Sequence, residues 1–179
     1  MRGPFAMLGE QMKQGAELAV ADLNAKGGVL GQKVKLISGD DKCDPEVAVT
    51  VAKFMVNQGV NFVAGHFCSA ASIAASDIYS QDDILLISPA STHPLLTDRG
   101  LENVFRVSGR DDQQGIIAGN LLADQFGGKK VAIVHDGQPY SLSLAEAAKS
   151  QLNSRGMNES VFQAVEPGAK DYGALVTTL

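Results

Sequence analysis

The amino-acid sequence predicts an α/β fold, built as a three-layer sandwich around a mostly parallel sheet. Helical patterns alternate with short strand patterns along the chain, as they do when parallel strands are joined by crossover helices. Apolar runs such as NFVAG (61–65) are typical of strands that are buried on both faces. Glycine and proline stand where these elements end or begin, and they mark the turns between them.

The first elements follow from periodicity and from turn residues. A helix is predicted over 6–26, because leucine, methionine and alanine recur on one helical face, and Gly27 then ends it. KVKLIS (33–38) is predicted as the first strand. Pro45 opens the next helix, which runs to residue 58, because proline is tolerated at the first helical position.

The second strand, 61–65, leads into a helix over 69–81 that Ser69 opens, and a further strand follows at 84–88. The later strands are predicted at 104–108, 130–136 and 159–165, and the later helices at about 111–126, at about 140–154 and from about 169. In folds of this class, ligands bind where loops and helix N-termini meet at the carboxyl ends of strands.

Composition narrows the function. The 179 residues carry a formal net charge of −5 with no cluster of Lys and Arg, so we expect no nucleic-acid partner. No apolar stretch approaches the roughly 18 to 20 residues that a membrane span needs, and no signal peptide is recognised at the start. Neither a P-loop nor a dinucleotide fingerprint occurs, so no cofactor is expected.

An acidic run after the first predicted strand holds Asp40, Asp41 and Asp44. Such a run is similar to a metal site or a phosphorylation pocket, but it lacks the spacing of a calcium-binding loop. We expect solvated loop charges here and no metal, with Asp44 as the N-cap of the helix that Pro45 opens.

Cys43 and Cys68 each follow a predicted strand and lie at the same end of the sheet, so a disulfide is favoured and a pair of free buried thiols stays open. Cys68 could instead be a nucleophile beside His66, but no third orienting group is evident. A zinc site that adds His93 to these three residues lacks the usual ligand spacings. The histidines, His135 included, are expected to make local hydrogen bonds in loops.

Two turns carry polar groups suited to a small ligand. Ser69 at a helix N-terminus either caps that helix or, together with exposed N–H groups, holds a carboxylate. In SPASTHP (88–94), Ala90, Ser91 and Thr92 present backbone groups and two hydroxyls between prolines. The two turns together can donate to a carboxylate and accept from an ammonium, so a zwitterion fits them, although SPASTHP could also be an ordinary proline-bounded loop.

Four segments together resemble a known family. They are residues 3–49, GHFCSAASIAASDIY (65–79), ISPASTHPLLT (87–97) and VAIVHDGQPYS (131–141). They are similar to the branched-chain amino-acid (Leu/Ile/Val)-binding proteins of ABC importers, which have the type I periplasmic binding protein fold. The resemblance implies a periplasmic, non-enzymatic protein that captures an amino acid and delivers it to a membrane permease. It also implies a flavodoxin-like lobe.

The same resemblance implies roles for individual residues. Cys43 and Cys68 match the family's disulfide pair, and Ser69 matches its ligand serine, with hydroxyl and amide toward the carboxylate. Ala90 and Thr92 would hold the charged head group, and Tyr140 would close over the ligand from the opposite lobe. The position near the side-chain pocket is Leu8 in this sequence. The family's second-lobe carboxylate that meets the ammonium has no counterpart here.

The resemblance also implies a division of the chain. Residues 1–127 match a first ligand-binding lobe without its opening strand, and 129–179 match the start of a second lobe. Alternatively, the strand and helix after residue 129 could fill the missing position and complete a single lobe, in the same chain or by strand exchange in a homodimer. An engineered or truncated scaffold without binding, an amino-acid sensor and a Cys/His enzyme are the other functions considered.

Overall fold

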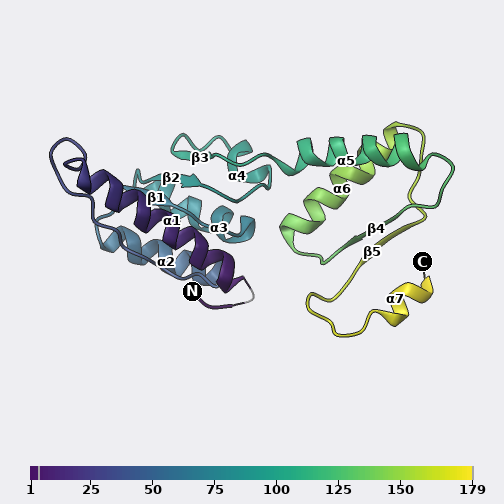
Figure 1. The fold of residues 1–179 in the computed structure, drawn as a ribbon, viewed down its shortest axis with the longest axis horizontal. Coiled ribbons are helices and arrows are strands. Elements are labelled where there is room, and N and C mark those ends of the chain that lie inside the picture. Colours follow the sequence, from purple (N-terminus) through teal and green to yellow (C-terminus); the bar gives the residue numbers. More distant parts are fainter. Residues whose placement is uncertain (4, 179) are drawn as a thin grey trace. The chain divides into compact units, whose positions relative to one another are not determined.

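The structure, a computed structural model, describes residues 1–3 and 5–178 and divides them into two compact units (Figure 1). Unit 1 is Met1–Ser91 with Leu95–Ser108, and unit 2 is Thr92–Pro94 with Gly109–Leu179. The α/β class with parallel strands is confirmed in both units. Within the described residues, no helix is long and apolar enough to cross a membrane.

Unit 1 holds a three-stranded parallel sheet in the order β1-β2-β3. Its elements are α1 (Ala6–Ala25), α2 (Pro45–Asn57), β1 (Phe62–Ala64), α3 (Ser69–Gln81), β2 (Leu85–Ser88), α4 (Leu95–Asp98) and β3 (Val104–Arg106). In register, Val63 pairs with Leu86, and Leu86 with Val104. The helices α2 and α3 pack together through small residues, Ala48 and Ala52 on one side and Ala71 and Ala75 on the other, all fully buried.

The strand predicted at 33–38 is wrong, since the structure has no strand there. The backbone of a strand needs a neighbouring strand to bond with, and none of the described strands pairs with this segment. The side chain of Asn24 in α1 replaces that neighbour at one point. Its amide nitrogen donates to the Val34 carbonyl at 2.9 Å, and its oxygen accepts from the Val34 N–H at 2.8 Å.

The helix α1 ends one residue before its predicted end, but none of its residues is buried. Leu18 and Leu23, which lie on the apolar face that the sequence indicates, are exposed. The apolar stripe of a helix is covered only when it packs on a second layer. Residues 33–38 supply no sheet beneath it, so the stripe stays accessible.

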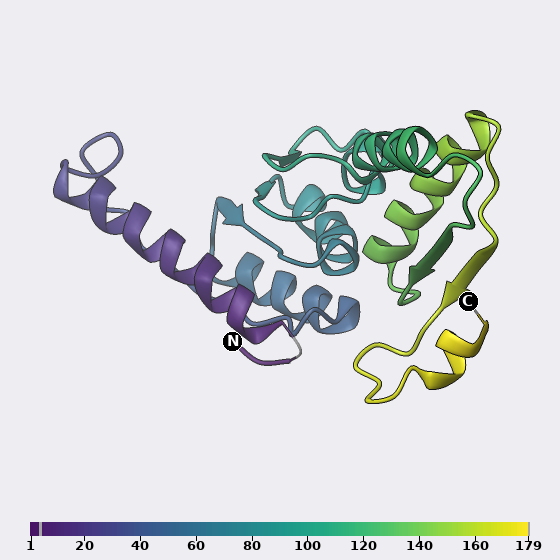
Figure 2. The same cartoon turned by 45° about the vertical axis from the view of Figure 1, so that its right-hand side comes forward.

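Unit 2 holds a two-stranded parallel sheet and a pair of helices in close contact. The two helices are drawn next to each other in both views (Figures 1 and 2). The elements of this unit are α5 (Asp111–Phe126), β4 (Ala132–His135), α6 (Pro139–Ser154), β5 (Val161–Ala164) and α7 (Gly173–Thr178). Gly115 and Gly119 of α5 face α6, and the backbones approach closely at both. Val131, Ile133, Ala145 and Leu152 form the core of this unit.

The packing of unit 2 concerns the predicted division of the chain into a lobe of residues 1–127 and a lobe that starts at residue 129. The helix α5 packs against α6, and both helices lie in unit 2. The division into lobes after residue 127 stays a prediction. The strand β4 pairs with β5. Among the described residues, β4 and β1 thus belong to different sheets.

Candidate binding site

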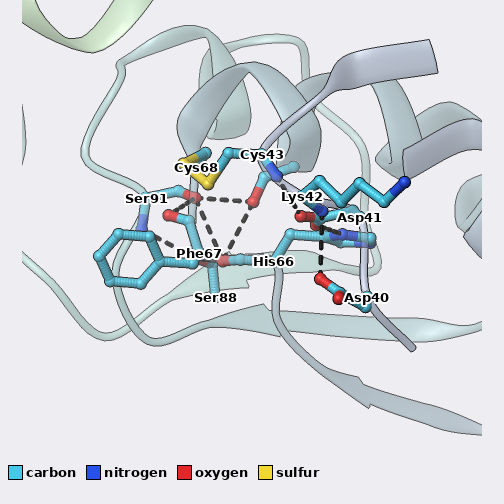
Figure 3. The surroundings of a disulfide bond; sticks show 10 residues. Asp40, Asp41, Lys42, Cys43, His66, Phe67, Cys68, Ser88 and Ser91 are labelled. Atoms are coloured by element: carbon cyan, nitrogen blue, oxygen red, sulfur yellow. Dashed lines mark hydrogen bonds and ion pairs between the residues drawn. A yellow bond between two sulfur atoms is a disulfide. The ribbon is translucent and has the colours of Figure 1, made fainter. Parts of the chain in front are cut away.

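A disulfide between Cys43 and Cys68 ties two loops of unit 1 together, with 5.3 Å between the two Cα atoms (Figure 3). This confirms the favoured interpretation of the two cysteines. It also removes the two alternatives that needed a thiolate, because both sulfur atoms are bonded to each other. Cys68 is therefore neither a nucleophile for His66 nor a metal ligand in this structure.

The side chain of His66, 6 % exposed, lies beside the disulfide and bonds two partners. Its Nδ1 is 2.5 Å from Oδ2 of Asp41 (Figure 3). Its Nε2 is 3.2 Å from the hydroxyl of Tyr79. The expectation that Asp41 is a solvated loop charge is wrong, because this carboxylate is mostly buried against the imidazole. The expectation for Asp44 is confirmed, since its carboxylate accepts from the N–H groups of Glu46 and Val47.

The backbone carbonyl of His66 is the centre of a cluster of serine hydroxyls. The hydroxyl of Ser88 lies 2.9 Å from it, that of Ser72 3.3 Å and that of Ser91 3.4 Å. Ser91 Oγ is also 3.1 Å from the Phe67 carbonyl and 2.6 Å from Ser72 Oγ. The turn after β1 and the turn after β2 are thus joined through buried hydroxyls, as the labelled residues of Figure 3 show.

The turn after β2 is held from both sides. Ser88 Oγ accepts from the N–H groups of Ala90 and Ser91, at 3.3 and 2.9 Å. The carbonyl of Ser91 accepts from the guanidinium of Arg106 at 3.1 Å and from the hydroxyl of Ser108 at 3.2 Å. The backbone of residues 88–91 is therefore fixed before any ligand arrives.

Ser69 is the first residue of α3, and Cys68, with extended backbone angles, takes the N-cap position. The predicted N-cap is thus displaced by one residue. Ser69 is buried at the helix end where backbone N–H groups point out of the helix and the helix dipole is positive. This arrangement suits a carboxylate.

Unit 2, taken by itself, has a group of buried polar atoms at Thr92 and Asp111. The N–H of Asp111 donates to the Thr92 carbonyl at 3.0 Å. Asp111 is 0 % exposed, and both oxygens of its carboxyl group lack a hydrogen-bond partner within the part of the chain that the structure describes. The hydroxyl of Thr92 is likewise buried without a partner among those residues.

Asp111 stands at the start of α5, where the helix dipole favours an anion by up to about 2 kcal/mol. Removing an ion from water costs several kcal/mol, so the dipole alone does not compensate a buried carboxylate. Sequence reasoning missed Asp111, because an aspartate at the start of a predicted helix is most simply a solvated first-turn residue. Its neighbour Asp112 behaves in that way and is paired with Arg110 at 2.8 Å.

The two remaining predicted site residues lie on helices. Leu8 is 38 % exposed on α1 of unit 1, and Tyr140 is 48 % exposed at the start of α6 in unit 2. The local environment of Tyr140 is ordered by Ser141, whose hydroxyl accepts from the Asp136 N–H at 3.0 Å. Ala90 and Ser91 lie on the turn after β2. The hydroxyl of Ser91 connects this turn to the carbonyl of Phe67, on the turn that leads to Ser69.

The contact between Asp41 and His66 leads to a prediction about pH. Burial raises the pKa of Asp41, but hydrogen bonds from the His66 ring and the Cys43 N–H outweigh it, and the pKa lies below its ordinary value. A carboxyl group whose pKa is lowered by folding stabilises the folded state above its unfolded pKa, about 3.9, and this stabilisation is lost as the pH falls through the folded pKa.

Asp41→Asn should therefore lower the free energy of unfolding by about 1 to 2 kcal/mol at neutral pH, because the His66 ring loses a charged partner. The difference between wild type and variant should shrink as the pH falls below about 4. Urea unfolding at a series of pH values measures both. A difference that stays constant down to pH 2 would contradict the proposed role of the Asp41 carboxylate.

The profile of a family described as periplasmic binding protein matches residues 1–179. The Leu/Ile/Val-binding protein homolog 2 of Brucella abortus is 46% identical over 179 residues, which are 100% of this chain and 48% of the relative. An amino acid binding protein of Pseudomonas aeruginosa is 45% identical over 99% of this chain and 48% of its own length. The chain spans about half the length of the curated relatives it matches.

Solved structures of substrate-binding proteins are similar to this chain as well. A branched-chain amino acid transporter substrate binding protein from Streptococcus pneumoniae, in complex with isoleucine, has a TM-score of 0.87 at 27% identity, over 99% of this chain and 50% of its own. An ABC transporter substrate-binding protein from Desulfitobacterium hafniense, in complex with Leu, has a TM-score of 0.75 at 34% identity, over 97% of this chain and 52% of its own.

Proposed function

Because this chain belongs to the periplasmic binding protein family, we propose that it binds a branched-chain aliphatic amino acid for delivery to the permease of an ABC importer. The observation that carries the proposal is the junction of the two turns at the carboxyl ends of β1 and β2, made by the hydroxyl of Ser91. The names of the relatives support the ligand class, since they are Leu/Ile/Val-binding or amino acid-binding proteins.

Each proposed ligand contact follows from the chemistry of the protein group that makes it. Ser69 and the N-terminus of α3 hold the carboxylate, because the N–H groups of the first helical turn and a hydroxyl can donate to it. The backbone of Ala90 and the hydroxyl of Thr92 bind the charged head group, and Ser91 keeps the two turns in place. Leu8 and Tyr140, both partly exposed, are the proposed contacts of the aliphatic side chain.

The wider setting is proposed on the same basis. Members of the family are periplasmic proteins, and a disulfide is typical of an oxidising compartment. We place unit 1 in the first lobe of a type I periplasmic binding protein and unit 2 in the second. The chain is proposed to bind without catalysis, in keeping with its family. A homodimer by strand exchange stays a prediction.

Calorimetric titration of the full chain with leucine, isoleucine, valine, alanine and phenylalanine tests the function. We expect heat of binding with the three branched-chain amino acids, and Ser69→Ala should weaken leucine binding by about 10-fold or more, because hydrogen bonds to charged groups contribute about 1.5 to 3 kcal/mol each. Ser80→Ala, near the other end of the same helix, is the matched control and should bind as wild type does. A wild-type chain that binds none of the five amino acids would overturn the proposal in favour of a scaffold without binding.

A further inference from the structure

We infer that His66 is a positioning residue of unit 1, whose ring and backbone carbonyl together set the geometry of the turn after β1 and the turn after β2. This role rests on the proposed function and deepens it, because it names a residue that orders the binding turns without being assigned a contact with the ligand. All the contacts that support it lie within unit 1. The sequence predicts local hydrogen bonds for this histidine, whereas the partners of its ring lie 25 residues before it and 13 after it.

His66 stands where the chain leaves the sheet. The hydrogen bonds between β1 and β2 extend to Gly65, whose N–H donates to the Ile87 carbonyl at 3.1 Å. From the next residue the chain turns toward α3, which begins at Ser69. A contact that fixes His66 therefore sets the point from which the first turn of α3 starts.

Both nitrogen atoms of the His66 ring have a partner, so the ring is fixed in one orientation. Nδ1 lies 2.5 Å from the Asp41 carboxylate (Figure 3), and because a carboxylate only accepts, Nδ1 carries the proton. In the neutral ring, Nε2 then accepts from the hydroxyl of Tyr79 at 3.2 Å. A half-turn of the ring would break both hydrogen bonds in a buried place, where unpaired polar groups are costly.

The loop that carries Asp41 is itself tied to the chain around His66. The other carboxylate oxygen of Asp41 accepts from the N–H of Cys43 at 2.7 Å. Cys43 is bonded to Cys68, two residues after the histidine (Figure 3). Lys42 and Cys43 have φ angles of 56° and 61°, in the left-handed region that residues with side chains disfavour. Such a conformation persists where surrounding contacts over-determine it, so the loop is a rigid base for the ring.

The backbone carbonyl of His66 connects the anchored ring to the two turns. Its three hydroxyl partners come from different places: Ser72 from the first turn of α3, Ser88 from the end of β2 and Ser91 from the turn after β2. A displacement of this carbonyl would therefore disturb all three hydroxyls at once. Because ring and carbonyl belong to one residue, the anchored ring limits that displacement and keeps the turns ordered before a ligand binds.

Leucine binding and amide hydrogen exchange of the full chain test this role. His66→Ala should weaken leucine binding about 5- to 30-fold, because the cost of ordering about one residue of backbone is met on folding in wild type but on binding in the variant. In the ligand-free chain, the N–H of Ser91, which donates to Ser88 Oγ, should exchange faster by a similar factor. His66→Asn should bring both values to within about 3-fold of wild type, because an asparagine amide can donate to Asp41 from the place of Nδ1.

Two further variants separate positioning from general destabilisation. Val104→Ala removes two methyl groups from the core at the amino end of β3, so it should lower the stability of unit 1 and leave the leucine affinity of the folded chain unchanged. Asp41→Ala should weaken leucine binding as His66→Ala does. The double variant Asp41→Ala/His66→Ala should bind leucine no more weakly than either single variant, because both substitutions break the same contact.

The outcomes separate the role of His66 from the proposed function. If wild type binds no leucine, the proposed function fails, and the exchange rate of the Ser91 N–H alone decides the role of His66. The inference is overturned if His66→Ala binds leucine as wild type does, if His66→Asn binds it as weakly as His66→Ala, or if the effects of Asp41→Ala and His66→Ala add. Should His66→Ala fail to fold, as circular dichroism would show, Asp41→Ala takes its place in the comparison with wild type and Val104→Ala.

Discussion

Replacing both cysteines, in Cys43→Ser/Cys68→Ser, should lower the free energy of unfolding of unit 1 by about 3.5 kcal/mol. The bond closes a loop with a sequence separation of 25 residues, and a cross-link over a loop of that length removes about 3.5 kcal/mol of chain entropy from the unfolded state at 25 °C. The effect is large compared with the total stability of an average domain, which is about 5 to 15 kcal/mol.

Urea unfolding followed by circular dichroism measures this loss, and it should be confined to the transition of unit 1, which contains both cysteines. A reductant provides the control: dithiothreitol should destabilise wild type to a similar extent and leave the double serine variant unaffected. If oxidised wild type and the double variant unfold at the same urea concentration, the bond contributes no stability and the chain-entropy estimate does not apply to this loop.

Gly115→Ala should destabilise unit 2 by about 1 to 3 kcal/mol, because the new methyl group overpacks the interface between α5 and α6. A Cβ atom at Gly115 would lie 2.8 Å from the backbone nitrogen of Ala148 and closer still to the Cβ atom of Ala147. A Cβ atom at Gly119 would lie 2.6 Å from the Cβ atom of Gln151 and 2.7 Å from the Ala148 carbonyl oxygen. Most of these neighbours are backbone or first side-chain atoms that cannot turn aside, so the helices must separate.

The double variant Gly115→Ala/Gly119→Ala should lose about 3 kcal/mol or more if the two clashes are not relieved by one shift. The control is the same substitution at Gly15, in the middle of α1, where an added Cβ would meet no heavy atom within 4 Å. There the better helix propensity of alanine should stabilise the chain by about 0.5 to 1 kcal/mol. Thermal or urea unfolding compares the three variants, and a stabilising effect of Gly115→Ala would contradict the close packing of α5 on α6.

Much of the fold could be predicted from local sequence, because helices depend mainly on periodicity and end residues. The helices α2 and α3 occur where the sequence indicates, within a residue at each end. Strands depend on partners distant in sequence, and here prediction was less successful. KVKLIS has the composition of a strand, yet residues 33–38 pair with no described strand, and Val34 is hydrogen-bonded to the side chain of Asn24.

The candidate site shows the same limit. The disulfide was favoured, since two cysteines at the same end of a predicted sheet can meet. The partners of His66, however, lie 25 residues before it and 13 after it, and no local signal connects Asp41 or Tyr79 to that ring. Asp111 was missed for a related reason: its burial depends on tertiary packing, while its sequence position resembles that of the half-exposed Asp112.

The carbonyl oxygen of His66 has a consequence for how the site can respond to charge. It has two lone pairs, yet three serine hydroxyls lie within 3.4 Å of it. One hydroxyl must therefore point its proton to another acceptor, and for Ser91 the Phe67 carbonyl and the Ser72 oxygen are both within reach. By rotating protons alone, with every heavy atom in place, this cluster can reorient its dipoles when an ion arrives, so the turns can polarise without giving up their rigidity.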